Sequence, residues 1–213
     1  FLNFFPQSEF RPMVRFRLGS LRFEEGKFMQ AAVDFTGVLD EGAADEIMAA
    51  SLYNLALCRR MIGQTAEARE TLDRYRATYP SGEGRTVEIA YQMGDIHEET
   101  GRFAEAVAEF ERALAAKPRA ELALELQYRI GACREQLGEA AGAVKAYEKA
   151  MASAEKADPY RLLAVARCAA MYEEREDWSR AISAYKDLIR HSQDEELVLA
   201  AGERVAQLEA IAR

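Results

Sequence analysis

Histidine, cysteine and tryptophan, which build many catalytic and metal centres, are scarce in this chain of 213 residues. It holds two histidines, three cysteines and one tryptophan. His97 is followed directly by Glu98, and because adjacent residues do not share a face of a helix, this pair does not make a metal site. The sequence has no G-x-S-x-G motif and no phosphate-binding loop. These absences predict a protein that is not an enzyme, has no catalytic residues, and binds no metal or cofactor.

The three cysteines are Cys58, Cys133 and Cys168, an odd number that predicts no disulfide framework. Each is expected to be a free, buried side chain that behaves as a small hydrophobe. The chain also lacks any run of 18 or more apolar residues. The sequence therefore predicts no direct membrane span.

Basic residues are outnumbered by acidic ones. The chain has 28 Lys and Arg against 36 Asp and Glu, which gives a formal net charge of -8. Nucleic acids and anionic membranes require a basic surface on the proteins that bind them. The acidic balance therefore argues against both as the main partner.

One helical pattern recurs along the chain. In residues 91–118, two apolar-periodic segments flank Thr100-Gly101-Arg102 and Pro118 follows the second segment. This order predicts a helix, a tight turn and a second helix. The turn position recurs at spacings of 37 or 38 residues, at Gly26, Gly63, Gly101, Gly138 and Glu176.

Three further positions keep a constant distance from each turn. Small residues stand seven positions before it, at Gly19, Ala56, Gly94, Gly131 and Ala169. Alanine stands five positions after it, at Ala31, Ala68, Ala106, Ala143 and Ala181. Large apolar residues stand nine positions after it, at Phe35, Leu72, Phe110, Tyr147 and Tyr185. Because a small residue at a helix crossing lets a bulky neighbour insert, these three columns predict tight packing between helices.

This pattern resembles the tetratricopeptide repeat family, whose units are helical hairpins of about 34 residues. The resemblance covers nearly the whole chain and implies an all-α fold, an α-α superhelix of hairpins that forms one solenoid domain over residues 1–213. It also implies a non-catalytic scaffold that binds a protein or peptide partner. The expected divisions are the end of an upstream repeat (1–7), five repeats (8–42, 43–80, 81–118, 119–157 and 158–192) and a capping helix (193–213).

Several helix ends can be placed from the sequence. The first two full helices are expected over Glu9–Glu25 and Phe28–Leu39, and the second helix of the fourth repeat is expected to be longer than the others. Asp158 should cap the next helix, with a proline at its first position. Ser192 with Glu195 predicts a capping box that opens a last helix over residues 194–212.

The period exceeds the usual 34 residues because extra residues follow the closing prolines. The junctions YPSGEGRTVEIAYQMG and FPQSEFRPMVRFRLG are similar to those of tetratricopeptide proteins of the Gram-negative envelope, which include the lipoprotein of the outer-membrane β-barrel assembly machine and the Tol-Pal accessory protein. This similarity implies a scaffold in a bacterial envelope assembly, periplasmic or associated with the outer membrane. The alternative is the sensory or regulatory arm of a larger cytoplasmic protein, with which three free cysteines are compatible. In either case residues 1–5 are expected to end an upstream helix, so the natural protein should continue N-terminally.

In this family the first helices of the hairpins line a concave surface that binds peptides. Aromatic residues stand ten positions before the first four turns, at Phe16, Tyr53, Tyr91 and Tyr128. Long polar residues stand nine positions before all five, at Arg17, Asn54, Gln92, Arg129 and Arg167. We predict that these residues and Asp95 line a groove that holds a partner segment, with Asp95, Glu98 and Glu99 making its middle acidic. The alternative is that the aromatic rings only cover the next hairpin.

Overall fold

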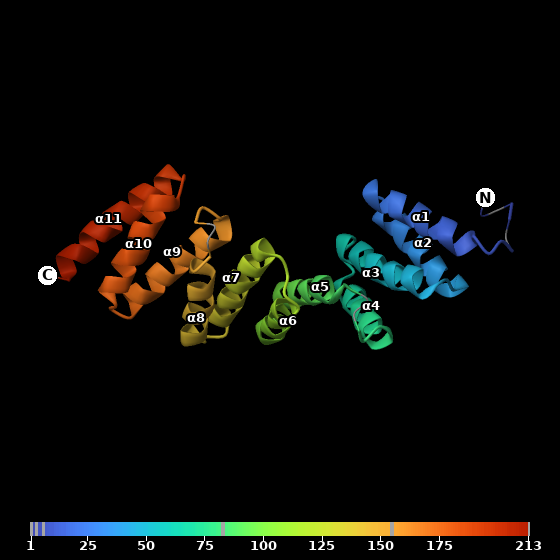
Figure 1. Cartoon of the computed structure of the whole chain (residues 1–213), viewed down its shortest axis with the longest axis horizontal. Coiled ribbons are helices and arrows are strands. Elements are labelled where there is room, and N and C mark those ends of the chain that lie inside the picture. Colours follow the sequence, from blue (N-terminus) through green and yellow to red (C-terminus); the bar gives the residue numbers. More distant parts are fainter. Residues whose placement is uncertain (1, 3, 6, 82–83, 154–155, 213) are drawn as a thin grey trace. The chain divides into compact units, whose positions relative to one another are not determined.

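The computed structural model describes residues 2, 4–5, 7–81, 84–153 and 156–212 (Figure 1). Within these ranges the chain forms eleven α-helices and no strand. The predicted all-α fold is confirmed. The helices are α1 (Arg11–Glu24), α2 (Phe28–Glu41), α3 (Asp45–Met61), α4 (Thr65–Thr78), α5 (Thr86–Glu99), α6 (Phe103–Ala115), α7 (Ala120–Gln136), α8 (Ala140–Met151), α9 (Pro159–Glu174), α10 (Trp178–His191) and α11 (Glu195–Ile211).

The chain divides into two compact units, residues 1–96 and residues 97–213. Unit 1 holds α1 to α4 and most of α5, and unit 2 holds the end of α5 and α6 to α11. Within each unit, consecutive helices pack as hairpins: α1 with α2 and α3 with α4, then α7 with α8 and α9 with α10. The second helices α2, α6, α8 and α10 also pack against the helices that follow them, α3, α7, α9 and α11. These hairpins therefore bury apolar faces against their neighbours, as a helical repeat requires.

Each turn between a first and a second helix contains a residue in the left-handed region. The φ angles are +73°, +79°, +72°, +73° and +59° at Gly26, Gly63, Gly101, Gly138 and Glu176. In each case the next residue donates its backbone N–H to a carbonyl five positions earlier, as Lys27 does to Arg22 at 2.8 Å. This bond satisfies a carbonyl that the end of the first helix would otherwise leave unpaired. The fifth turn keeps the same backbone conformation without a glycine.

The small and large columns meet inside the hairpins. In the first hairpin, a Cβ atom on Gly19 would lie 3.0 Å from Cε1 of Phe35. In the fourth, a Cβ atom on Gly131 would lie 2.6 Å from Cδ1 of Tyr147. The alanines five positions after the turns, Ala31, Ala68, Ala106, Ala143 and Ala181, are each 0% exposed. The predicted packing between small residues and bulky side chains is confirmed.

The structure corrects the expected start of α1 and leaves part of the N-terminal expectation untested. α1 begins at Arg11 and not at Glu9. A helix that began at Glu9 would carry Pro12 deeper in its first turns, whereas the later start leaves this proline where no backbone donor is needed. The expected upstream repeat end at residues 1–7 includes residues 1, 3 and 6, which lie outside the described residues.

The fourth repeat does not have the longer second helix that was predicted. α8 ends at Met151 and has 12 residues. The buried Arg161 donates its Nε–H to the carbonyl oxygen of Met151 at 3.0 Å and an Nη1–H to that of Lys156 at 3.0 Å. Because a side chain from α9 satisfies these carbonyls, the chain after α8 does not need further helical bonds.

The residue that caps α9 is as predicted, and the residue that caps α11 is not. Asp158 caps α9, and its carboxylate accepts the backbone N–H of Tyr160 at 2.8 Å. The predicted capping box at Ser192 is wrong, because Ser192 is the C-cap of α10, directly after its last residue His191. Its hydroxyl oxygen instead accepts the backbone N–H of Asp194 at 3.1 Å, and Asp194 caps α11 by accepting from Leu197.

Candidate partner-binding wall

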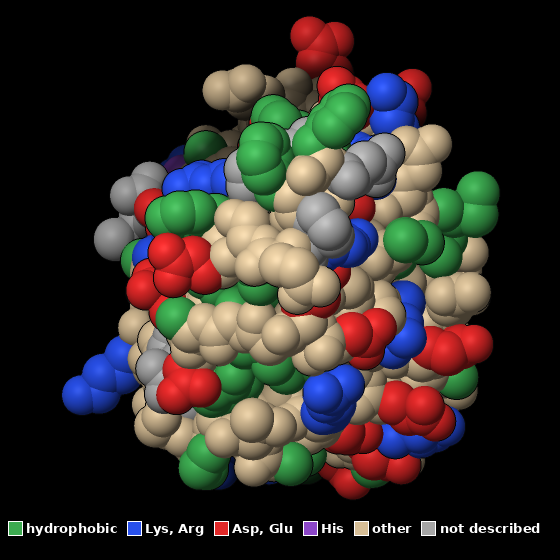
Figure 2. All heavy atoms as spheres, turned by 90° about the vertical axis from the view of Figure 1, so that its right-hand side faces the viewer, with side chains coloured by type: hydrophobic (Ala, Val, Ile, Leu, Met, Phe, Trp, Pro, Cys, Tyr) green, Lys and Arg blue, Asp and Glu red, His purple; other side chains and the backbone are tan. Residues whose placement is uncertain are grey.

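The predicted binding residues of unit 1 lie on α1, α3 and α5. Phe16 is half-buried, and its ring centre lies 5.8 Å from that of the fully buried Phe35. Phe16 therefore serves packing at least on one side. Arg17 is exposed and lines an apolar hollow of about 660 Å³ together with Met13 and Leu21 of the same helix. Figure 2 shows hydrophobic side chains in separate groups among charged ones at this end of unit 1.

Tyr53 and Asn54 are both half-buried on α3. The ring of Tyr53 packs against the core of α3, α4 and α5, and the guanidinium carbon of Arg85 lies 4.8 Å from its centre. This is the geometry of a cation–π contact. Burial raises the pKa of the Tyr53 hydroxyl, and the nearby Glu88 raises it further. The hydroxyl therefore stays protonated at neutral pH and can donate a hydrogen bond.

On α5, Tyr91 is half-buried, whereas Gln92 and Asp95 are held by the preceding first helix. Arg60 of α3 donates to Oδ2 of Asp95 at 2.9 Å and also to the side-chain oxygen of Gln92. Asp95 is 9% exposed. The positive charge of Arg60 offsets the negative charge of Asp95. This part of the wall is therefore less acidic than its sequence alone indicates.

In unit 2, the half-buried Tyr128 of α7 lies near two other tyrosine rings. Its ring centre is 5.7 Å from that of Tyr147 and 5.8 Å from that of Tyr160. Tyr147 is fully buried and Tyr160 is half-buried at the start of α9. Tyr128 thus packs against the core and remains partly exposed.

Arg129 and Arg167, predicted to contact a partner, both form ion pairs within unit 2. Nε of Arg129 lies 3.0 Å from Oε2 of Glu98, and its guanidinium carbon lies 4.5 Å from the ring centre of Phe110. Arg167 makes a two-pronged contact to Glu135, with distances of 2.7 Å from Nη2 to Oε1 and 3.0 Å from Nε to Oε2. Glu135 raises the pKa of Arg167. Half of the Arg167 side chain remains exposed.

These ion pairs belong to a ladder that the sequence prediction missed. A glutamate three positions before a turn pairs with an arginine on the next first helix, and α11 takes the place of a first helix in the last pair. We call these pairs the Glu–Arg ladder: Glu98–Arg129, Glu135–Arg167 and Glu173–Arg204. The sequence contains a signal for this ladder. A glutamate stands three positions before one turn, and an arginine stands nine positions before the next turn.

Two tyrosines of the large apolar column tie the ladder to the second helices. The Tyr147 hydroxyl donates to Oε2 of Glu135 at 2.8 Å, and the Tyr185 hydroxyl donates to Oε2 of Glu173 at 3.2 Å. Hydrogen bonds from Arg204 are the main cause that lowers the pKa of Glu173. The charge of Arg204 and the hydrogen bond from Tyr185 lower the pKa further, whereas burial of Glu173 acts in the opposite direction. The ladder therefore fixes the spacing of the first helices of unit 2 through charge-assisted hydrogen bonds.

The three buried cysteines have unreactive thiols. Cys58, Cys133 and Cys168 are free and at most 1% exposed. Burial raises the pKa of each thiol to about 12, so the reactive thiolate is scarce at neutral pH.

Among the residues that the structure describes, no three His, Cys, Asp or Glu side chains lie close enough to hold a metal ion. The described helices are each too short or too polar to cross a membrane.

Comparison with known proteins shows the family. Three tetratricopeptide repeat profiles match residues 47–119, 91–160 and 164–199, which together cover most of the chain. The chain belongs to the tetratricopeptide repeat family. No match was found among curated proteins.

Solved tetratricopeptide structures share this fold at low sequence identity. One crystal structure of the MamA protein matches with a TM-score of 0.69 and 20% identity, over 86% of this chain and 93% of that one. A MamA fragment from Desulfovibrio magneticus RS-1 matches with a TM-score of 0.67 and 13% identity, over 84% and 93% of the two chains. YrrB, described as a protein with an unusual peptide-binding site, matches with a TM-score of 0.69 and 14% identity, over 94% and 96%. At these identities the likeness extends to the fold alone.

Proposed function

We propose that this chain is a non-catalytic scaffold that binds a segment of a partner protein along its first helices. We call the proposed surface the first-helix wall: Phe16, Arg17, Tyr53, Asn54, Tyr91, Gln92 and Asp95 in unit 1, and Tyr128, Arg129 and Arg167 in unit 2. The observation that carries the proposal is the half-buried state of Tyr53, Tyr91 and Tyr128. Each ring is only partly buried, so a partner can reach its exposed part, and rigid aromatic anchors supply much of the energy of interfaces.

The arginines of the wall form ion pairs within the chain and still have N–H donors left for a partner. A guanidinium group has five N–H donors, and Arg167 uses two of them on Glu135. The remaining donors can bind backbone carbonyls or carboxylates of a partner. Because the ladder already fixes these side chains, less conformational entropy is lost on binding than for free arginines.

The test uses peptides selected from a random displayed library against the purified protein. Tyr91→Ala combined with Tyr128→Ala should weaken the selected peptides by about 2–4 kcal/mol, or about 30- to 1,000-fold. Leu199→Ala is the matched control, because Leu199 is 66% exposed on α11 and outside the wall. Circular dichroism and thermal melting show whether each variant is folded.

Two outcomes would contradict this assignment. A folded double variant that binds as tightly as the parent would place the interaction elsewhere. A double variant that unfolds would show that the tyrosine rings serve packing, which is the alternative that the sequence left open.

We further propose that the scaffold acts in a bacterial envelope assembly, periplasmic or associated with the outer membrane. The support is the 37- or 38-residue period and the two proline junctions. The alternative is the regulatory arm of a larger cytoplasmic protein. Fractionation of source cells, with protease treatment of spheroplasts, separates the two: digestion before lysis supports the envelope, and protection until lysis supports the cytoplasm.

A further inference from the structure

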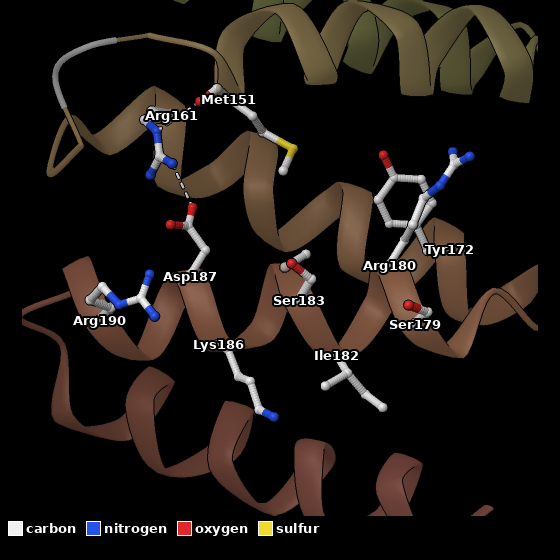
Figure 3. Close-up of a pocket in the computed structure, with 11 residues that line it drawn as sticks. Met151, Arg161, Tyr172, Ser179, Arg180, Ile182, Ser183, Lys186, Asp187 and Arg190 are labelled. Carbon is white, nitrogen blue, oxygen red and sulfur yellow. Dashed lines mark hydrogen bonds and ion pairs between the residues drawn. The ribbon is translucent and has the colours of Figure 1, made fainter. Parts of the chain in front are cut away.

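The outer side of α10 carries a hollow of about 580 Å³ that the first-helix wall does not include. Met151, Ile182 and Ala184 supply apolar surface, and the ring of Tyr172 lies at one end (Figure 3). Arg167 of the wall and Tyr172 of the hollow are five residues apart on α9, which separates their directions by about 140° around the helix. We call this feature the α10 hollow.

Basic side chains dominate the lining of the α10 hollow. They are Arg161, Arg180, Lys186 and Arg190, and among the described lining residues the acidic one is Asp187. Asp187 is already engaged, because its Oδ2 lies 2.5 Å from Nη2 of Arg161 and its Oδ1 lies 3.0 Å from Nδ1 of His191. The lining residues of the hollow therefore include more positive than negative side chains, in a chain of net charge -8.

Not all of this positive charge is neutralised at the rim. Arg180 lies 3.2 Å from Asp177 and 3.9 Å from Glu148. Lys186 lies 2.7 Å from Glu209, and these three carboxylates are not among the lining residues of the hollow. The side chains of Arg180 and Lys186 are still 64% and 52% exposed. Arg190 is exposed and forms no ion pair with the described residues.

The polar groups are spread along α10 on one face. Ser179, Ser183, Lys186 and Arg190 follow the spacing i, i+4, i+7 and i+11, which keeps them in line. Eleven residues of helix span about 16 Å, which equals the length of about five residues of extended chain. In Figure 3, Arg190 and Asp187 lie at one end, Arg180 and Tyr172 at the other, and Ser183 with Ile182 between them.

We infer that the α10 hollow docks an acidic linear segment of a partner protein. Carboxylates of the segment would face Arg190 and Arg180, and an apolar side chain between them would lie against Met151 and Ile182. Charge complementarity favours this occupant, because the exposed cations are spaced along a groove with an apolar floor. A nucleic acid is disfavoured, because its long run of phosphates would meet the acidic remainder of the chain.

The test measures binding of a fluorescein-labelled decapeptide of alternating Glu and Leu, by anisotropy at low salt, with the full chain. Arg190→Glu should weaken binding by about tenfold or more, because it replaces attraction by repulsion. The matched control is Arg74→Glu on α4, which makes the same charge change at an exposed arginine that forms no ion pair with the described residues. We expect less than about a twofold change for this control.

A second variant blocks the hollow without changing its charge. Ser183→Trp, at an exposed position on its rim, should fill the space and also reduce binding by about tenfold. The combined Tyr91→Ala and Tyr128→Ala variant should bind the acidic decapeptide normally, which separates this inference from the proposed function of the wall.

Several results would overturn the inference. One is that Arg190→Glu and Arg74→Glu weaken binding equally, and another is that the folded Ser183→Trp variant binds as tightly as the parent. A third is that a decapeptide of Lys and Leu binds as well as the one of Glu and Leu. The last is that the parent chain fails to bind the Glu and Leu decapeptide.

Discussion

The second helices α2 and α10 stand at equivalent places in their hairpins, and the same six positions of each line a hollow on its outer side. The hollow beside α2 measures about 560 Å³ and that beside α10 about 580 Å³. The lining positions are Met29, Ala32, Val33, Thr36, Gly37 and Asp40 in α2, and Ser179, Ile182, Ser183, Lys186, Asp187 and Arg190 in α10. In α2 the exposed positions are mainly apolar, with Met29 71% and Val33 66% exposed. In α10 they are polar and basic.

This difference shows that the hairpin and its surface chemistry depend on different positions. On the inner side, both helices present an alanine that is 0% exposed, Ala31 in α2 and Ala181 in α10. On the outer side, the same backbone carries Val33 in one helix and Ser183 in the other. The buried positions build the repeat, and the exposed ones are free to set what each hairpin contacts.

The largest expected effect tests the shared inner positions. Ala31→Trp and Ala181→Trp should each lower the free energy of unfolding by about 3 kcal/mol or more, because neither site has room for an indole. Val33→Trp and Ser183→Trp, on the outer side of the same helices, should stay within about 0.5 kcal/mol. Urea unfolding followed by circular dichroism measures all four. Similar losses at inner and outer positions would contradict the division.

The next effect tests a difference between the two hairpins at one lining position. Asp187 in α10 binds the buried Arg161, whereas Gly37 in α2 leaves space for Arg15, which reaches Glu41 at 2.7 Å. Arg161→Met should cost about 3 kcal/mol, because Oδ2 of Asp187 and two backbone carbonyl groups lose the donors that the buried Arg161 supplies.

The matched variant at the first hairpin should cost far less. Arg15→Met should cost about 1 kcal/mol or less, because Arg11 still lies 2.8 Å from Glu41. Urea unfolding measures both. Equal costs would show that Arg161 is no more structural than a surface arginine.

The sequence predicted the repeat because its signal is periodic and local. Gly19 and Gly131 stand at fixed distances from their turns, and the rings of Phe35 and Tyr147 fill the space that they leave. The Glu–Arg ladder was missed because each pair joins residues 31 or 32 positions apart. Such pairs become visible only when the columns of different repeats are compared for opposite charge. The hollow beside α10 could not be foreseen, since it depends on where α8 ends and on the buried Arg161.

A smaller effect concerns the turns that precede α2 and α10. Gly26 and Glu176 both have positive φ, but glycine alone adopts this conformation without steric cost. Glu176→Gly should therefore stabilise the protein by about 0.5–1 kcal/mol, and Gly26→Glu should destabilise it by about 1 kcal/mol. Thermal unfolding measures both. A loss of stability in Glu176→Gly would mean that the glutamate side chain makes a contribution beyond its backbone.

The smallest effect depends on pH and distinguishes the first helices of the two hairpins. Three positions before the turn, α9 has Glu173 and α1 has Phe23. The pKa of Glu173 is lowered in the folded protein, so its stabilising effect is present above the unfolded-state value of about 4.3 and is lost as the pH falls through the folded value. Glu173→Gln should cost about 1 kcal/mol or less at pH 7.

The difference between Glu173→Gln and the parent should disappear in acid. Phe23→Leu is the control, because it removes no titratable group and its effect should not follow the same pH dependence. Stability measured from pH 3 to pH 7 tests this pair. A cost of Glu173→Gln that does not change with pH would contradict the role of its charge.

Amide hydrogen exchange tests the proposed first-helix wall most directly. Peptides would be selected against the Ser183→Trp variant, in which the α10 hollow is filled, and exchange would be compared with and without bound peptide. We predict slower exchange in the first helices α3, α5, α7 and α9, where the wall tyrosines and arginines lie. Slower exchange confined to the second helices α2, α4, α8 and α10 would contradict the account.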